Sequence, residues 1–130
     1  LFMRHYPEWA ELKQRRIPED AARGYFQGLD GRLVRCSSEH LMLAGYLQNG
    51  EKIVMARAAI KTETELRDID EMYDLVNFVH DELQYDSDAS HVEMVGTSAM
   101  NFIIDQASQL NLNCPLAANM KVGKNWAETH

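Results

Sequence analysis

The sequence has few of the features that mark disulfide-rich, secreted or membrane proteins. Its 130 residues include only two cysteines, Cys36 and Cys114. They are too few and too far apart for a disulfide framework or a zinc site, so we expect both to be reduced. The chain also lacks a run of about 18 apolar residues and a basic segment followed by an apolar one. We therefore expect a cytoplasmic protein with no membrane partner.

Positive charge is also scarce, because 20 acidic side chains against 13 basic ones give a net charge of −7. The two signs are separated along the chain. Residues 13–35 carry six lysines and arginines, whereas residues 63–93 carry eleven acids and a single arginine, Arg67. This pattern fits a phosphate-binding edge beside a metal-binding edge, and it fits equally well two solvated faces of opposite sign. Overall acidity therefore does not exclude a nucleic-acid partner.

Apolar residues that recur about every 3.6 positions predict three helices. These helices cover residues 2–16, about 39–65, and 91–110. We expect Pro18 to interrupt the first, because proline lacks the backbone N–H that a helix interior needs. Ser37 and Ser38 are expected to cap the second helix.

Alternating apolar residues and turn signals predict two hairpins and one further strand. The first hairpin covers residues 24–35 with Asp30-Gly31 as its turn, and the second joins residues 72–78 to residues 83–85. The further strand is expected at residues 115–122, and residues 67–70 form a charged connection of no clear structure. Helices and hairpins in this order predict one α+β domain over residues 1–130, with a small antiparallel sheet packed against long helices.

The tip of the second hairpin, Val79-His80-Asp81-Glu82, is the most informative motif. Two adjacent carboxylates repel each other and raise each other's pKa unless a cation lies between them. Mg²⁺ is commonly held by one or two carboxylates together with substrate phosphates, so such a tip suits phosphoryl transfer. A solvated acidic turn is the alternative interpretation of these four residues.

Four motifs occur in an order that resembles a known family. They are Gly28-Leu29-Asp30-Gly31-Arg32, Leu47-Gln48 in the long helix, Val79-His80-Asp81-Glu82, and the stretch Gly123-Lys124-Asn125-Trp126 through His130. In these motifs the chain resembles the C-terminal part of family A DNA polymerases, the class of bacterial DNA polymerase I and of short-tailed phage replicative enzymes. The phage branch is the nearest, and the likeness covers about the whole chain. It implies a fragment derived from the palm and fingers, with His-Asp-Glu on a palm hairpin.

The resemblance implies a role for each matching residue. Asp81 and Glu82 would be the catalytic carboxylates and metal ligands for two Mg²⁺ ions, with Glu82 the more auxiliary of the two. His80 would lie against the primer terminus. Gln48 would donate a hydrogen bond into the minor groove of the terminal base pair, where every pair presents acceptors. Arg32 would hold the duplex backbone, where cations position the DNA without reading its sequence.

Three departures from the family pattern affect the expected DNA contacts. Ala44 stands where the family usually has an asparagine, four residues before Gln48. Asn49-Gly50-Glu51-Lys52 replaces the small residues that normally follow the glutamine. Leu33 stands where a second basic residue often follows Arg32. These changes concern the long helix and the first hairpin and leave the expected metal ligands intact.

The resemblance also implies residues that this chain does not show. Neither the family's first motif, with the partner aspartate, nor the fingers helix that holds the incoming nucleotide is found in the sequence. One aspartate turn cannot hold two ions about 4 Å apart, because each ion needs ligands from two sides. We therefore expect a part of a DNA-directed DNA polymerase that is inactive alone. It would act with the remaining polymerase portion, primer–template DNA and dNTP, in the host cytoplasm if a phage encodes it.

A non-catalytic module is the alternative function. Such a module would have kept the palm scaffold and would bind nucleic acid or another protein. A neighbouring gene that ends in the fingers motif would favour the split enzyme over the module.

Overall fold

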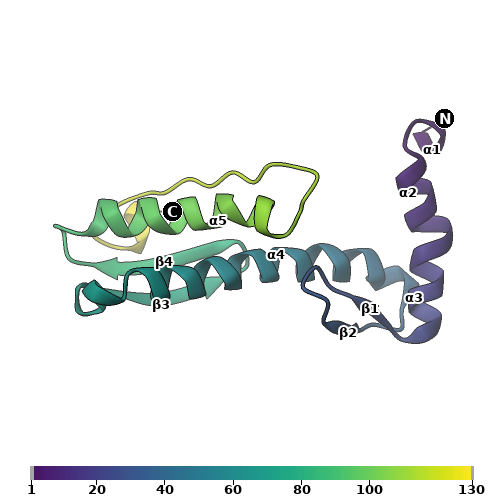
Figure 1. Ribbon diagram of the computed structural model, residues 1–130, viewed down its shortest axis with the longest axis horizontal. Coiled ribbons are helices and arrows are strands. Elements are labelled where there is room, and N and C mark those ends of the chain that lie inside the picture. The colour runs from purple at the N-terminus through teal and green to yellow at the C-terminus, as the bar shows by residue number, and fades with distance from the viewer. Residues whose placement is uncertain (1, 130) are drawn as a thin grey trace. The chain divides into compact units, whose positions relative to one another are not determined.

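The computed structural model describes residues 2–129, and for residues 2, 3 and 70 it describes the backbone alone. Residues up to Glu51 form one compact unit, and residues from Lys52 onward form another. Each unit contains one two-stranded antiparallel sheet and several helices. The predicted α+β class is confirmed, with two small sheets in place of the single one expected (Figure 1).

The first unit opens with four consecutive helical segments. They are α1 (Phe2–His5), α2 (Pro7–Glu11), η1 (Leu12–Arg16) and α3 (Ile17–Arg23). Tyr6 leaves the helical region, with φ −131° and ψ 77°. The ring of Pro7 disfavours a helical conformation in the residue before it, and proline itself is well suited to the first position of α2.

The predicted interruption at Pro18 is wrong. The preceding residue, Ile17, keeps helical angles of φ −60° and ψ −51°, and its N–H donates to the carbonyl of Leu12, five residues back. Residues 12–16 thus form a wide π-helical turn, after which Pro18 lies in the first turn of α3. Proline is tolerated in the first turn of an α-helix, where its missing N–H and its fixed φ disturb the helix least.

The first predicted hairpin is confirmed. It consists of β1 (Tyr25–Gln27) and β2 (Leu33–Arg35), which pair Phe26 with Val34. Gly31 adopts φ 86°, a left-handed conformation that glycine reaches without a steric penalty, and its N–H donates to the carbonyl of Gly28 at 3.0 Å. The Asp30-Gly31 turn therefore lies where the sequence places it.

The long helix α4 (Glu39–Glu65) begins directly after the two predicted capping serines and ends where expected. Its first half covers the hairpin of the first unit. A Cβ atom at Gly45 would lie 3.2 Å from Cε1 of Phe26, so the missing side chain lets the ring approach the helix. The edge of Phe26 meets the Tyr46 ring at 4.6 Å between centroids. This contact joins a core that is described by its buried members Ile17, Ala21, Phe26 and Met42.

The second unit combines the end of α4 with a hairpin and another helix. Its elements are η2 (Arg67–Met72), β3 (Tyr73–Val79), β4 (Glu82–Ser87), α5 (Val92–Gln109) and α6 (Trp126–Thr129). The predicted hairpin and the predicted helix at 91–110 are both confirmed. Residues 67–70, expected to lack structure, belong to the short 3₁₀ helix η2. The helix α5 lies along β4 (Figure 1).

Helices α4 and α5 are joined by polar contacts around a buried glutamine. Gln106 is 1% exposed, and its Oε1 accepts a hydrogen bond from Arg57 Nε at 3.0 Å. One turn away, Lys61 Nζ lies 3.8 Å from a carboxylate oxygen of Asp105 and 4.8 Å from the centre of the Phe102 ring. These contacts fix the helix pair that supports the hairpin β3–β4.

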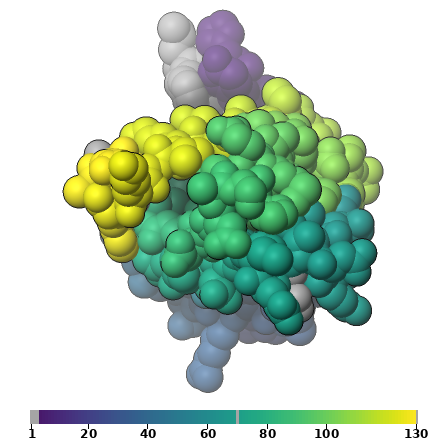
Figure 2. All heavy atoms as spheres, turned by 90° about the vertical axis from the view of Figure 1, so that its left-hand side faces the viewer, coloured from purple at the N-terminus to yellow at the C-terminus, as the bar shows by residue number. Residues whose placement is uncertain are grey.

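The predicted strand at residues 115–122 is wrong, because these residues form no regular element. The segment instead packs its side chains against α5. A Cβ atom at Gly96 would lie 2.6 Å from the sulfur of Met120, so Met120 fills the space that the glycine leaves. Figure 2 shows this C-terminal stretch in yellow, lying over the green surface of α5.

Candidate metal and DNA-binding site

The hairpin β3–β4 carries the predicted acidic motif at its tip. Val79 and Glu82 form the last cross-strand pair, so the turn itself consists of His80 and Asp81. His80 adopts φ 51°, a left-handed conformation that is uncommon for residues other than glycine, although histidine and asparagine tolerate it better than most. The side chains of His80 and Asp81 are exposed, and that of Glu82 is half-buried. The three predicted site residues are therefore together in one turn.

A row of side-chain amides fixes the position of Glu82. Gln84 Nε2 donates to Glu82 Oε1 at 2.7 Å, and Asn77 Nδ2 donates to Gln84 Oε1 at 3.2 Å. An irregularity between Leu75 and Asn77 shifts the register of β3, so that Asn77 lies opposite Gln84. Such bulges redirect side chains along a strand. One carboxylate oxygen of Glu82 is thus held by the hairpin.

Sequence reasoning missed Asn77 and Gln84. Residues two apart on a strand share a face, so the spacing of Glu82 and Gln84 was a usable signal. The bulge that brings Asn77 to the same face leaves no comparable mark in the sequence.

Two tyrosines pack together in the part of the hairpin that lies away from the tip. Tyr73 is buried, and its ring lies 5.9 Å from that of Tyr85. Burial raises the pKa of Tyr85 to about 12; the nearby Thr62 side chain opposes this shift, and the carboxylate of Glu63 adds to it. Tyr85 therefore stays neutral at physiological pH.

The donor set at the tip fits part of a Mg²⁺ site. Asp81 and Glu82 offer hard carboxylate oxygens, which Mg²⁺ prefers. In the part of the chain that the structure describes, no group of three or more His, Cys, Asp and Glu side chains is placed to hold a metal ion. Two carboxylates can hold an ion only when substrate oxygens, water or another polypeptide complete its shell.

The other two predicted site residues, Gln48 and Arg32, belong to the first unit. Gln48 is exposed on α4. The loop that carries Arg32 packs against α4 at Gly50. A Cβ atom at Gly50 would be 3.4 Å from Cδ1 of Leu29, which belongs to this loop. Gln48 comes two residues before Gly50 and therefore lies on another, exposed face of α4.

Arg32 is exposed but already has an anionic partner. Its Nε donates to Oδ2 of Asp30 at 2.5 Å, and its backbone N–H donates to Oδ1 at 3.2 Å. Desolvation would raise the pKa of Asp30, but the hydrogen bonds and the positive charge of Arg32 outweigh it and lower that pKa. Arg32 would have to share its charge between Asp30 and a DNA phosphate.

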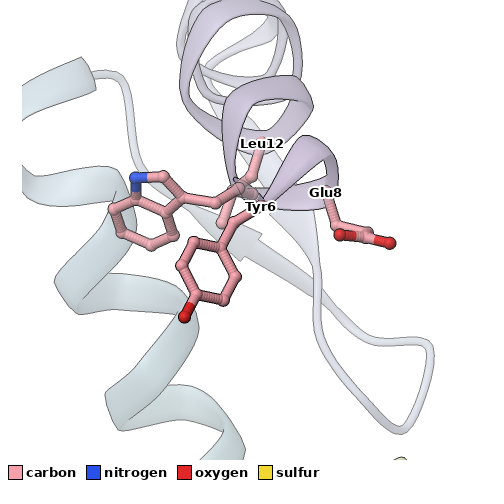
Figure 3. A pocket seen from close by; sticks show the side chains of 4 residues that line it. Tyr6, Glu8 and Leu12 are labelled. Carbon is pink, nitrogen blue, oxygen red and sulfur yellow. The ribbon is translucent and has the colours of Figure 1, made fainter. Parts of the chain in front are cut away.

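A shallow hollow near the start of the chain has no set of side chains suited to bind phosphate or a metal ion. Tyr6, Glu8, Trp9 and Leu12 line it (Figure 3). The walls are mostly apolar, and Glu8 is the single charged member. We assign it no role. The matching C-terminal motif continues to His130, which lies outside the described residues.

Comparison with known proteins agrees with the polymerase resemblance. No family model matches the chain. It is 28% identical over 122 residues to a DNA-directed DNA polymerase of Escherichia phage Phieco32, covering 88% of this chain and 20% of that protein. It is 30% identical over 118 residues to a DNA-directed DNA polymerase of Enterobacteria phage T3, covering 83% of this chain and 16% of that protein.

These similarities define the chain as a sequence related to one region of phage DNA-directed DNA polymerases. The chain spans a fifth or less of the length of these two relatives. Among the described residues, no helix is long and apolar enough to cross a membrane.

Proposed function

We propose that this chain is the C-terminal palm portion of a family A DNA-directed DNA polymerase. Residues 1–130 would act together as one domain of that enzyme. The observation that supports this function most is the exposed His80-Asp81 turn followed by an anchored Glu82, within a chain that is similar to phage polymerases over most of its length.

The chain's part in nucleotidyl transfer would be to supply two carboxylates, one of which is held in place. Asp81, exposed at the tip, and Glu82, held by Gln84, would bind Mg²⁺. When bound, Mg²⁺ activates a primer 3′-hydroxyl and neutralises charge on the triphosphate. The hydrogen bond from Gln84 would limit how far the Glu82 carboxylate reorganises when negative charge develops, and such preorganisation is a main source of catalysis.

The remaining site residues would contact DNA. His80, fixed in its left-handed conformation beside Asp81, would lie against the primer terminus. Gln48 would donate to minor-groove acceptors, which are present in every Watson–Crick pair. Arg32 would contact a backbone phosphate. Its existing ion pair with Asp30 would weaken that contact.

The isolated chain would be inactive. Two carboxylates cannot by themselves set the geometry of a two-ion site. The remaining polymerase portion would have to provide the other ligands and the nucleotide site, and primer–template DNA and dNTP would bind the assembled enzyme.

Primer extension tests this function. The chain is mixed with a polypeptide that carries the thumb, the fingers and the first catalytic aspartate, and extension of a labelled primer is measured with Mg²⁺. We expect extension by the mixture and none by either part. Asp81→Ala should lower the rate by at least about 100-fold, the loss typical of removing one transition-state electrostatic contact.

Asp86→Ala is the matched control. Asp86 is an exposed acid of the same hairpin, paired with Asp74 away from the tip, so its removal changes charge equally and should leave extension within about twofold. Equal loss in both variants would refute the assignment of Asp81. Nucleic-acid binding without extension in any mixture would favour the non-catalytic module.

A further inference from the structure

The outer face of the hairpin β1–β2 carries polar and aromatic side chains. Its register pairs Tyr25 with Arg35 and Phe26 with Val34. Paired residues of an antiparallel sheet project to the same side, and neighbours along a strand project to opposite sides. Phe26 is buried against α4, so Tyr25 and Arg35 lie side by side on the opposite, exposed face.

This face borders a hollow with two arginines. The hollow is lined by Arg23, Gly24, Tyr25, Leu33, Arg35 and Ser37. The guanidinium of Arg23 lies over the Tyr25 ring, 5.7 Å from its centre. The lining contains two cations, a hydroxyl and an aromatic ring, and no acidic side chain. Its chemistry suits an anion that also has a flat or apolar part.

A buried carboxylate holds one of these arginines in place. Asp20 is 2% exposed and accepts hydrogen bonds from Arg23 and, at 2.5 Å, from the hydroxyl of Tyr46. Arg16 Nε lies 4.0 Å from the same carboxylate. Asp20 is thus shared by two guanidinium groups and cannot neutralise both. The side chain of Arg23 stays 57% exposed and keeps donors for another partner.

Arg35 differs from Arg15 and Arg32, which have carboxylate partners. Arg15 is bound by Glu11 at 2.5 Å and by Glu19 at 2.9 Å, and Arg32 is bound by Asp30. Among the described residues, no carboxylate oxygen lies within 4.0 Å of the Arg35 guanidinium. The positive charge of the hollow is therefore available to an external anion.

We propose that this hollow binds the phosphodiester backbone of a single nucleic-acid strand. Arg23 and Arg35 contact phosphate oxygens, the Ser37 hydroxyl donates to the same backbone, and the Tyr25 ring stacks on a base or sugar. Arginine pairs well with phosphate because its planar donors match the phosphate oxygens. Aromatic rings next to cations are the usual means of holding single strands without reading their sequence. The proposed polymerase function supplies the class of ligand, and the site is separate from Arg32 and Gln48.

Fluorescence anisotropy of the 130-residue chain with a labelled 20-nucleotide DNA strand tests the proposal. Arg35→Gln is the cleanest variant, because the Arg35 side chain has no ion-pair or hydrogen-bond partner among the described residues that its removal would leave unpaired. We expect at least about fivefold weaker binding and a shallower salt dependence, by about 0.7 in the log–log slope for one lost phosphate contact. Tyr25→Leu should weaken binding at least about fivefold and leave the slope unchanged, because stacking releases no counterions.

Arg15→Gln provides the matched control, since it removes the same charge from an arginine that two glutamates already neutralise. We expect its affinity to stay within about twofold of the wild type. If Arg15→Gln and Arg35→Gln weaken binding equally, overall charge and not the hollow governs binding, and the proposal is wrong. Unchanged binding by Arg35→Gln would contradict it directly.

Two further measurements separate the possible ligands and functions. Millimolar tripolyphosphate should compete poorly with the strand if stacking contributes, and full displacement would show a site for free phosphates instead. Asp81→Ala should bind the strand like the wild type, because it alters the other unit. If Asp81→Ala loses primer extension but still binds the strand, both proposals are supported. If Asp81→Ala still extends primers, the proposed catalytic site is wrong, and the proposal that the hollow binds a strand is unaffected.

Discussion

Removal of one hydroxyl, in Tyr46→Phe, should destabilise the first unit measurably. The Tyr46 hydroxyl donates at 2.5 Å to Asp20, a carboxylate that is 2% exposed. Hydrogen bonds to charged groups contribute about 1.5–3 kcal/mol, and a buried acceptor that loses one cannot recover it from water. Arg16 and Arg23 still contact Asp20 in the variant. We therefore expect the lower part of that range, about 1.5–2 kcal/mol.

Urea denaturation followed by Trp9 fluorescence measures this loss. Trp126 lies in the second unit. All variants are therefore made in a Trp126→Phe background, in which Trp9 of the first unit gives the tryptophan fluorescence. Tyr25→Phe is the control, because Tyr25 lies on the exposed face of the hairpin and its hydroxyl should contribute within about 0.5 kcal/mol. If the two variants are equally stable, the Asp20 contact does not stabilise the fold.

Burial of the Tyr46 side chain predicts a dependence of stability on pH. Burial raises the pKa of Tyr46 above its ordinary value of 10.0, although the charges of Arg16 and Arg23 oppose the shift. Because the folded pKa lies above the unfolded one, the stabilising contribution is fully present below pH 10 and is lost as the pH rises through the folded value. The difference between wild type and Tyr46→Phe should stay constant from pH 7 to 9 and shrink above pH 10. Shrinkage on acidification to pH 7 would contradict this assignment.

Three other substitutions test contacts in the second unit. Gln84→Leu removes the donor to Glu82 and should weaken Mn²⁺ binding about tenfold, the usual effect of losing a partner of a metal ligand; a titration with equal affinity would contradict this. Gln106→Leu should cost about 1–3 kcal/mol in urea denaturation, because it removes two hydrogen bonds of a fully buried amide; no loss would show that the amide is dispensable. Gly96→Ala should destabilise the wild-type protein, because the Met120 sulfur occupies the space of the new methyl group. In a Met120→Ala background the same substitution should stabilise the protein by up to about 1 kcal/mol, because alanine has the higher helix propensity. The same sign in both backgrounds would refute the packing argument.

The elements that the sequence predicted correctly depend on local patterns. The two hairpins and the helices α4 and α5 follow from alternating or 3.6-residue spacing and from the Asp30-Gly31 turn, all of which act within a few residues. The position of His80 and Asp81 at the tip could also be predicted from local sequence, because it follows from the pairing of the two adjacent strands.

The errors occur where no local sequence pattern marks the structure. Pro18 stays helical because a π-helical turn precedes it, and no residue type marks that turn. Residues 115–122 form no strand, and Met120 in this segment packs into the space left by Gly96, 24 residues earlier in the sequence. The contact between Asp20 and Tyr46 joins residues 26 apart in sequence, so no spacing rule could have indicated it.

Titration of the chain with Mn²⁺ tests the central claim most directly. Mn²⁺ replaces Mg²⁺ at oxygen sites and broadens the amide signals of nearby residues, so it reports where the ion binds. We expect broadening to centre on His80, Asp81 and Glu82, and binding to be weak because the ligand set is partial. The broadening should disappear in Asp81→Ala and persist in Asp86→Ala. Broadening centred on the acidic stretch of residues 63–71, unaffected by Asp81→Ala, would show that the hairpin tip is a solvated turn and not a metal site.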